Sequence, residues 1–147
     1  MRLEREVHLD ATPEAVYEVV MDPHRLKDWV SIHQGLDDAP EGQLEEGSTL
    51  RQTLKLAGRP FEVRWTVTTD RKPKEVVWDG DGPVGSKAGV EYHFEAEDGG
   101  TRFRYVNVWD LPGGAVGKFA GRFVAGSRIP DRELDRSLEN LKGLFEG

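Results

Sequence analysis

Apolar and polar residues alternate through the middle of the chain. The alternation is clearest in four runs, at 49–56, 61–68, 90–97 and 102–109, and the stretch "EVVWDG" at 75–80 lies between the second and third. A period of two is typical of strands that bury one face. Turn-forming residues separate the runs, as in Lys72-Pro73 and "EDGG". We therefore predict an antiparallel meander between about positions 31 and 110.

The first thirty or so residues follow a different pattern. An alternating run at 3–9 is followed by Thr12-Pro13, a typical helix start because Thr caps the first turn and Pro fits the first helical position. Asp22-Pro23 ends that helix and begins a second, shorter one before Trp29. Since these elements are too short to form a core, we expect them to plug one end of a curved sheet.

The C-terminal part carries two apolar stripes at helical spacing. Gly126 and Pro130 lie between the stripes, so we predict one long helix with a break or kink, placed across the mouth of the sheet. The first stripe comprises Val116, Phe119, Ala120 and Phe123, and the second comprises Leu134, Leu138, Leu141 and Phe145.

The composition limits the classes of function. A length of 147 residues suits one domain, spanning 1–147. The net charge of −7 argues against nucleic acid or an anionic membrane surface as partner. No apolar run approaches the roughly 20 residues of a membrane span, and no secretory signal precedes the first strand, so we expect a cytoplasmic protein without an integral membrane segment. The lack of cysteine excludes disulfides, thiolate nucleophiles and Cys-bound metals.

Three stretches resemble the polyketide cyclase/dehydrase and coenzyme-Q-binding-type members of the SRPBCC, or START-like, superfamily. "ATPEAVYEVVMDPHRLKDW" is similar to the family's opening, "TRFRYVNVWDLPGG" to its last strand and "RELDRSLENLKGLFEG" to its terminal helix. The resemblance implies an α+β helix-grip fold of order β-α-α-β6-α, in which a curved antiparallel sheet wraps around a long C-terminal helix. It also implies an apolar cavity between sheet and helix, which members use to hold lipids, polyketides, quinones or hormones.

Aromatic residues are frequent on the sheet face that should look inward. Each one alone is explained by an ordinary core, but as a group they exceed what one helix can cover, which favours a cavity. Gln52 and Asn107 interrupt this face and either contact a ligand or bond to neighbouring backbone, to a buried water or to solvent at the rim. The predicted ligand-binding residues are Trp29, Gln52, Trp65, Trp78, Tyr92, Phe94, Phe103, Tyr105, Asn107, Trp109, Phe119 and Phe123.

Candidate catalytic and metal-binding groups are few. His24, Asp28 and His33 cluster near the second helix, but metal-ligand spacing is absent and Asp28 is explained by a solvated helix face. No nucleophile has a base beside it in the pattern, and a cyclase would have to rely on Tyr92 or Tyr105 as a weak acid. We therefore predict no metal, no cofactor and no catalytic residues.

Our interpretation is a protein that binds or transports an apolar or amphipathic small molecule, such as a lipid, quinone or polyketide-like compound, as a monomer or homodimer. Two alternatives stay open: a polyketide cyclase, aromatase or dehydratase on the same fold, and a protein-interaction module without a ligand.

Overall fold

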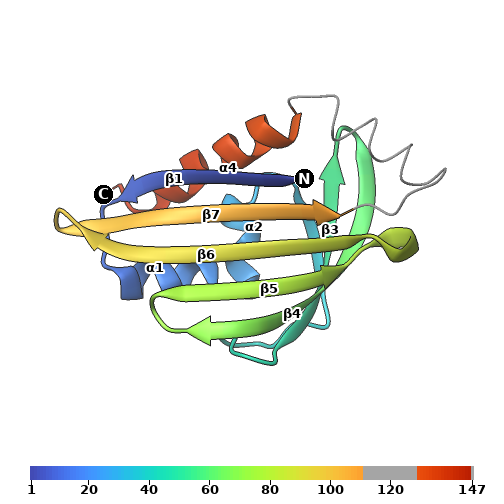
Figure 1. The fold of residues 1–147 in the computed structure, drawn as a ribbon, viewed down its shortest axis with the longest axis horizontal. Coiled ribbons are helices and arrows are strands. Elements are labelled where there is room, and N and C mark those ends of the chain that lie inside the picture. Colours follow the sequence, from blue (N-terminus) through green and yellow to red (C-terminus); the bar gives the residue numbers. More distant parts are fainter. Residues whose placement is uncertain (111–128, 147) are drawn as a thin grey trace.

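The structure is a computed structural model that describes residues 1–110 and 129–146. A single antiparallel sheet has the strand order β1-β7-β6-β5-β4-β3-β2 and curls around the helices (Figure 1). The predicted meander is therefore confirmed. The strands of the whole sheet are β1 (Arg2–Leu9), β2 (His33–Asp37), β3 (Thr49–Leu56), β4 (Arg59–Arg71), β5 (Glu75–Asp81), β6 (Lys87–Glu97) and β7 (Gly100–Asp110), of which β2 to β7 form the meander.

The two faces of the sheet carry different chemistry. Tyr92 pairs with Tyr105 across β6 and β7, and the rings lie on the inner face with centroids 5.6 Å apart. Many residues of the other parity are charged and form ion pairs on the outer face, as Arg104 does with Glu4 at 2.8 Å. The period of two in the sequence thus separates an aromatic inner face from a salt-bridged outer face.

Tight turns connect the central strands. Between β6 and β7, Asp98 and Gly99 have φ values of 47° and 78°. Positive φ at both central residues matches the twist of adjacent strands in a two-residue hairpin. The turn predicted from "EDGG" is therefore present.

The N-terminal helices form as their capping residues predict. They are α1 (Pro13–Val20), a 3₁₀ turn η1 (Pro23–Arg25) and α2 (Leu26–Trp29). A second 3₁₀ turn, η2 (Pro83–Gly85), lies between β5 and β6. Thr12 Oγ1 accepts a hydrogen bond from the Ala15 N–H at 3.2 Å, and Asp22 Oδ1 accepts from the His24 N–H at 3.0 Å. Helix α1 contacts β6 and β7 and closes one end of the inner face.

Helix α4 (Ile129–Leu144) lies against α2 and β1, as Figure 1 shows. Leu134, Leu138 and Leu141 are buried, which confirms that this stripe anchors the helix. Pro130 falls in its first turn, where the missing N–H has no helical partner to lose. Gly126, Phe119 and Phe123 lie outside the described residues, and so does the predicted continuation of the helix.

An ion-pair clamp joins the first strand to the last helix. Arg5 Nη2 lies 2.8 Å from Asp131 Oδ1, and its Nε lies 3.0 Å from Asp135 Oδ1. Arg5 comes from β1 and both acids come from α4, so the two ends of the chain are held together. No helix in the described part of the chain is long and apolar enough to cross a membrane.

Candidate functional site

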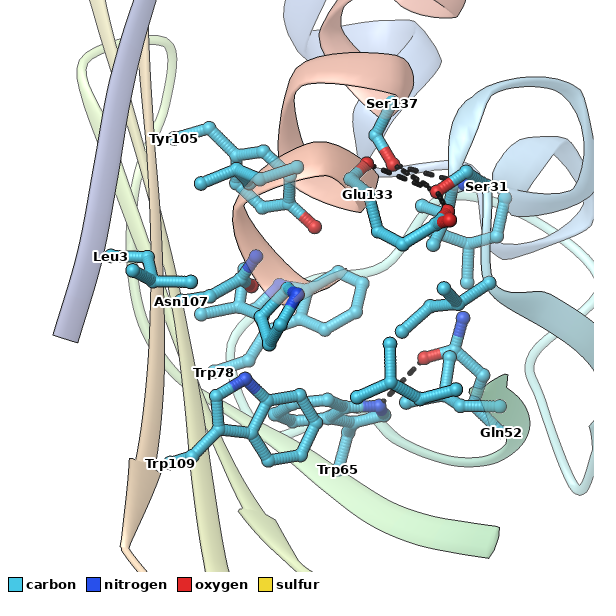
Figure 2. Close-up of a pocket in the computed structure, with 18 of the residues that line it drawn as sticks. Leu3, Ser31, Gln52, Trp65, Trp78, Tyr105, Asn107, Trp109, Glu133 and Ser137 are labelled. Atoms are coloured by element: carbon cyan, nitrogen blue, oxygen red, sulfur yellow. Dashed lines mark hydrogen bonds between the residues drawn. The ribbon is translucent and has the colours of Figure 1, made fainter. Parts of the chain in front are cut away.

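A pocket lies between the inner face of the sheet and the first turns of α4 (Figure 2). The segment after α2 contributes Val30, Ser31 and Ile32 to its lining. The helix side is formed by Pro130, Glu133, Leu134 and Ser137 of α4, and the sheet side by residues of β1 and of β3 to β7.

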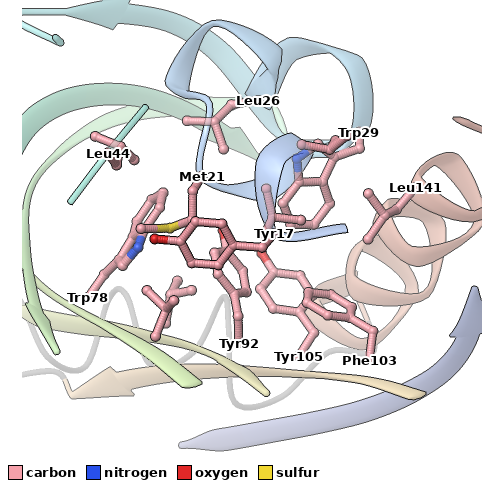
Figure 3. Close-up of a cluster of buried hydrophobic side chains, with 14 of the residues drawn as sticks. Tyr17, Met21, Leu26, Trp29, Leu44, Trp78, Tyr92, Phe103, Tyr105 and Leu141 are labelled. Carbon is pink, nitrogen blue, oxygen red and sulfur yellow. The ribbon is translucent and has the colours of Figure 1, made fainter. Parts of the chain in front are cut away.

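The pocket gathers most of the residues predicted to bind a ligand. Those that line it are Gln52, Trp65, Trp78, Tyr92, Tyr105, Asn107 and Trp109. Trp29, Phe94 and Phe103 do not line it and belong to the hydrophobic core beneath α1 and α2, where Trp29 and Phe103 are completely buried (Figure 3). Phe119 and Phe123 lie outside the described residues.

The free space in the pocket is small. Its volume is about 50 Å³, which is room for about three to five water molecules at roughly 10–15 Å³ each. Pockets for drug-sized ligands have volumes of about 300–1,000 Å³. The predicted ligand-sized cavity is therefore not confirmed.

The buried amide of Gln52 is hydrogen-bonded on both sides. Trp65 Nε1 donates to Gln52 Oε1 at 2.9 Å, and Gln52 Nε2 lies 2.9 Å from Nδ1 of His33. An indole N–H can only donate, so the amide oxygen must face Trp65 and the amide nitrogen must donate to a neutral His33. Burial, with a smaller contribution from Lys27, lowers the pKa of His33, in agreement with that neutral form. The chain of bonds holds the Trp65 indole in the pocket wall.

A second polar cluster closes the helix side of the pocket. Ser31 Oγ donates to Glu133 Oε2 at 2.6 Å, and the Ser31 N–H donates to Ser137 Oγ at 2.9 Å. Nearby, Asn140 Nδ2 donates to the backbone oxygen of Trp29 at 3.2 Å. These bonds fasten α4 to the end of α2 and place one carboxylate at the pocket (Figure 2).

This cluster was not predicted from the sequence. Glu133 and Ser137 are four residues apart and so share a helix face beside the leucine stripe, which was the one available signal. Ser31 lies 106 residues from Ser137, in a segment without periodicity. Their contact depends on how α2 and α4 pack, which no local pattern shows.

Tyr105 and Asn107 lie next to each other on the inner face of β7, and both line the pocket. Burial raises the pKa of Tyr105 to about 12, although the neighbouring Asn107 side chain opposes this shift. Burial also raises the pKa of Tyr92 well above its usual value. Both phenols are therefore neutral near pH 7 and are poorer proton donors than an ordinary tyrosine, which weakens their candidacy as the acid of a cyclase.

Two buried indole N–H groups have no hydrogen-bond partner in the described part of the chain. They belong to Trp78, which lines the pocket, and to Trp29, which does not. Trp78 meets the rings of Trp65 and Tyr92 edge to face, with centroids 5.8 and 5.5 Å apart. Aromatic rings are weak acceptors, so this donor remains largely unused.

The histidines and acids near the second helix do not form a site. His24 Nε2 lies 3.0 Å from the Pro40 carbonyl oxygen, and Asp28 pairs with Arg25 at 3.1 Å. Residues 1–110 and 129–146 contain no group of three or more His, Cys, Asp or Glu side chains arranged to hold a metal ion.

Comparison with known proteins identifies relatives of similar length. An uncharacterised protein of Mycobacterium tuberculosis is 26% identical over 147 residues, covering 97% of each chain. A second M. tuberculosis protein, named as a toxin, is 24% identical over 148 residues, covering 99% of each chain.

Solved structures share the fold. The ZhuI aromatase/cyclase from Streptomyces sp. R1128 has a TM-score of 0.76 at 14% identity, covering 98% of this chain and 92% of that one. The ginseng (Panax ginseng) major latex-like protein 151 has a TM-score of 0.69 at 11% identity, covering 100% and 98%. At these identities the likeness shows the α+β helix-grip fold alone.

The sequence profile described as polyketide cyclase / dehydrase and lipid transport matches residues 1–146. This range includes both short N-terminal helices, the whole sheet and α4. The chain belongs to the polyketide cyclase/dehydrase and lipid transport family of the SRPBCC superfamily.

Proposed function

We propose that the protein binds a small apolar or amphipathic molecule in the pocket between the sheet and α4. The observation that carries this proposal is the convergence of aromatic and polar side chains from distant parts of the sequence, such as Trp78, Asn107 and Glu133, on one pocket. Apolar walls with a few placed polar groups are typical of small-molecule sites. The family's description, which includes lipid transport, supports the same reading.

Binding explains the described lining better than catalysis does. Among the described residues of the pocket lining, Ser31 is the one whose hydroxyl donates a hydrogen bond to a carboxylate, that of Glu133. Carboxylates are in general weak bases, and a nucleophilic serine usually needs a histidine or an amine beside it to be ionised. We therefore favour a carrier or ligand-binding role over a cyclase or dehydratase.

The small volume of the pocket favours a second candidate function, which is interaction with another protein without a ligand. At about 50 Å³ the free space does not admit a lipid or quinone unless side chains move apart. A member of this fold that binds no ligand would act through contacts with another protein. Any ligand that does enter must be small or must displace side chains of the pocket lining.

One experiment separates these functions. The protein is purified from its own host and measured by native mass spectrometry, and then again after denaturation. A discrete small molecule that is released on denaturation supports the binding function. Bare protein in the native spectrum, together with the absence of pocket-localised NMR shifts when small hydrocarbons and ketones are added, favours the protein-interaction role.

A further inference from the structure

The pocket wall contains a fully buried hydrogen-bond donor that has no acceptor among the described residues. Trp78 is 1% exposed, and its Nε1 has no partner among the described residues. The neighbouring Trp65 is equally buried, but its N–H is used by Gln52 at 2.9 Å. Figure 2 shows the Trp78 indole extending from the sheet toward the space that the labelled residues surround. A buried donor without an acceptor destabilises the folded protein, and a ligand oxygen would relieve that cost.

The charge of the pocket restricts which kind of ligand oxygen can accept a hydrogen bond from Trp78. Glu133 is the one acidic side chain of the described lining, and burial keeps the phenols of Tyr92 and Tyr105 protonated. No Lys, Arg or His is present in the described lining to balance a second negative charge. The whole chain also has a net charge of −7. An anionic ligand would be repelled and would lose its hydration without compensation.

We propose that the pocket selects neutral ligands that carry a carbonyl oxygen, which accepts a hydrogen bond from Trp78 Nε1, and that it rejects carboxylates of the same size. This specificity rests on the proposed binding function. It distinguishes ketones, esters and quinones from free fatty acids and other carboxylic acids, all of which are amphipathic.

Three probes of nearly equal size test the proposal: acetophenone as the neutral carbonyl, cumene as the matched hydrocarbon and benzoate as the matched carboxylate. Their dissociation constants are measured by titrating ¹⁵N-labelled protein and following amide and indole N–H signals. Acetophenone should bind about three- to tenfold more tightly than cumene, which is the usual net gain from one hydrogen bond. Benzoate should bind most weakly of the three.

Two variants form a matched pair. Trp78→Phe and Trp29→Phe each remove a buried indole N–H without a partner, but only Trp78 lines the pocket. Trp78→Phe should abolish the preference for acetophenone over cumene, whereas Trp29→Phe should retain it. In the wild-type protein, the Trp78 indole proton should move downfield with acetophenone and not with cumene, which gives a readout independent of how well either variant folds.

The outcomes separate this specificity from the function on which it rests. If cumene binds as tightly as acetophenone, if benzoate matches acetophenone, or if Trp78→Phe keeps the preference, the carbonyl assignment is wrong and the pocket still binds ligands. If none of the three probes binds, the proposed binding function fails and the carbonyl assignment fails with it.

Discussion

The hydrogen bonds of Gln52 allow a quantitative test of how the pocket wall is held. Gln52→Leu removes two bonds, but the former partners differ in exposure. Trp65 is 2% exposed, so its N–H would be left in the interior without an acceptor, whereas His33 is only half-buried and can reach water. One buried donor left unpaired costs about 1–3 kcal/mol. We expect the free energy of unfolding of Gln52→Leu to fall by that amount.

A double-mutant cycle isolates the bond itself. Trp65→Phe alone leaves the Gln52 oxygen without its donor, but combining Trp65→Phe with Gln52→Leu leaves neither group unpaired. The destabilisation of the double variant should therefore be smaller than the sum of the single effects by about 1–2 kcal/mol, within the usual range for residues in contact.

Urea unfolding followed by far-UV circular dichroism measures these changes, because tryptophan fluorescence is itself altered by the substitution. For a slope of about 2 kcal/mol per molar urea, Gln52→Leu should lower the midpoint by about 0.5–1.5 M. If the two single effects add to within about 0.5 kcal/mol, Trp65 does not depend on Gln52 and the reasoning is wrong.

Three further predictions concern His33, helix α4 and Asn107. Burial and Lys27 keep the pKa of His33 below its usual value of 6.5, so His33 binds a proton more readily in the unfolded chain. The free energy of unfolding should therefore fall as the pH drops below 6.5 toward the folded pKa, and His33→Gln should flatten that part of the pH dependence. Leu138→Ala, which truncates a buried anchor of α4, should cost about 2–5 kcal/mol; an unchanged urea midpoint would contradict the packing of the helix. Asn107→Leu should leave the fold intact and weaken binding of a naphthoquinone by about 1–3 kcal/mol while sparing a matched hydrocarbon, as measured by titration; equal quinone affinities would remove Asn107 from the site.

Strand alternation predicted the face on which a side chain lies but not its depth along the sheet. Phe103 and Tyr105 have the same parity on β7, and both lie on the inner face as predicted. Only Tyr105 lines the pocket, because Phe103 lies farther along the strand, within the core cluster. The period of two carries no information on where helices cover a strand, so it could not separate pocket residues from core residues.

The polar groups of the site were harder to predict, for a related reason. One of the two partners of Gln52 is His33 on β2. This short strand contains Gly35 and has a register shift, so its alternation is too brief to recognise. Ser31 and Ser137 are joined only by the packing of α2 on α4. Contacts between segments far apart in the chain follow from shape and packing, which local periodicity does not encode.

The pairing of β1 with β7 and α4 has a consequence for synthesis of the protein. Residues 2–9 find their hydrogen-bonding partners only at residues 101–108, and Arg5 finds its acids later still. At about 5–20 residues per second, on the order of 5–20 s pass between translation of β1 and of β7. During that time an alternating, strand-forming segment is outside the ribosome with an unpaired edge, which is the feature that chaperones and aggregating chains recognise. Nascent chains halted before residue 101 should therefore be bound by chaperones more strongly than completed chains.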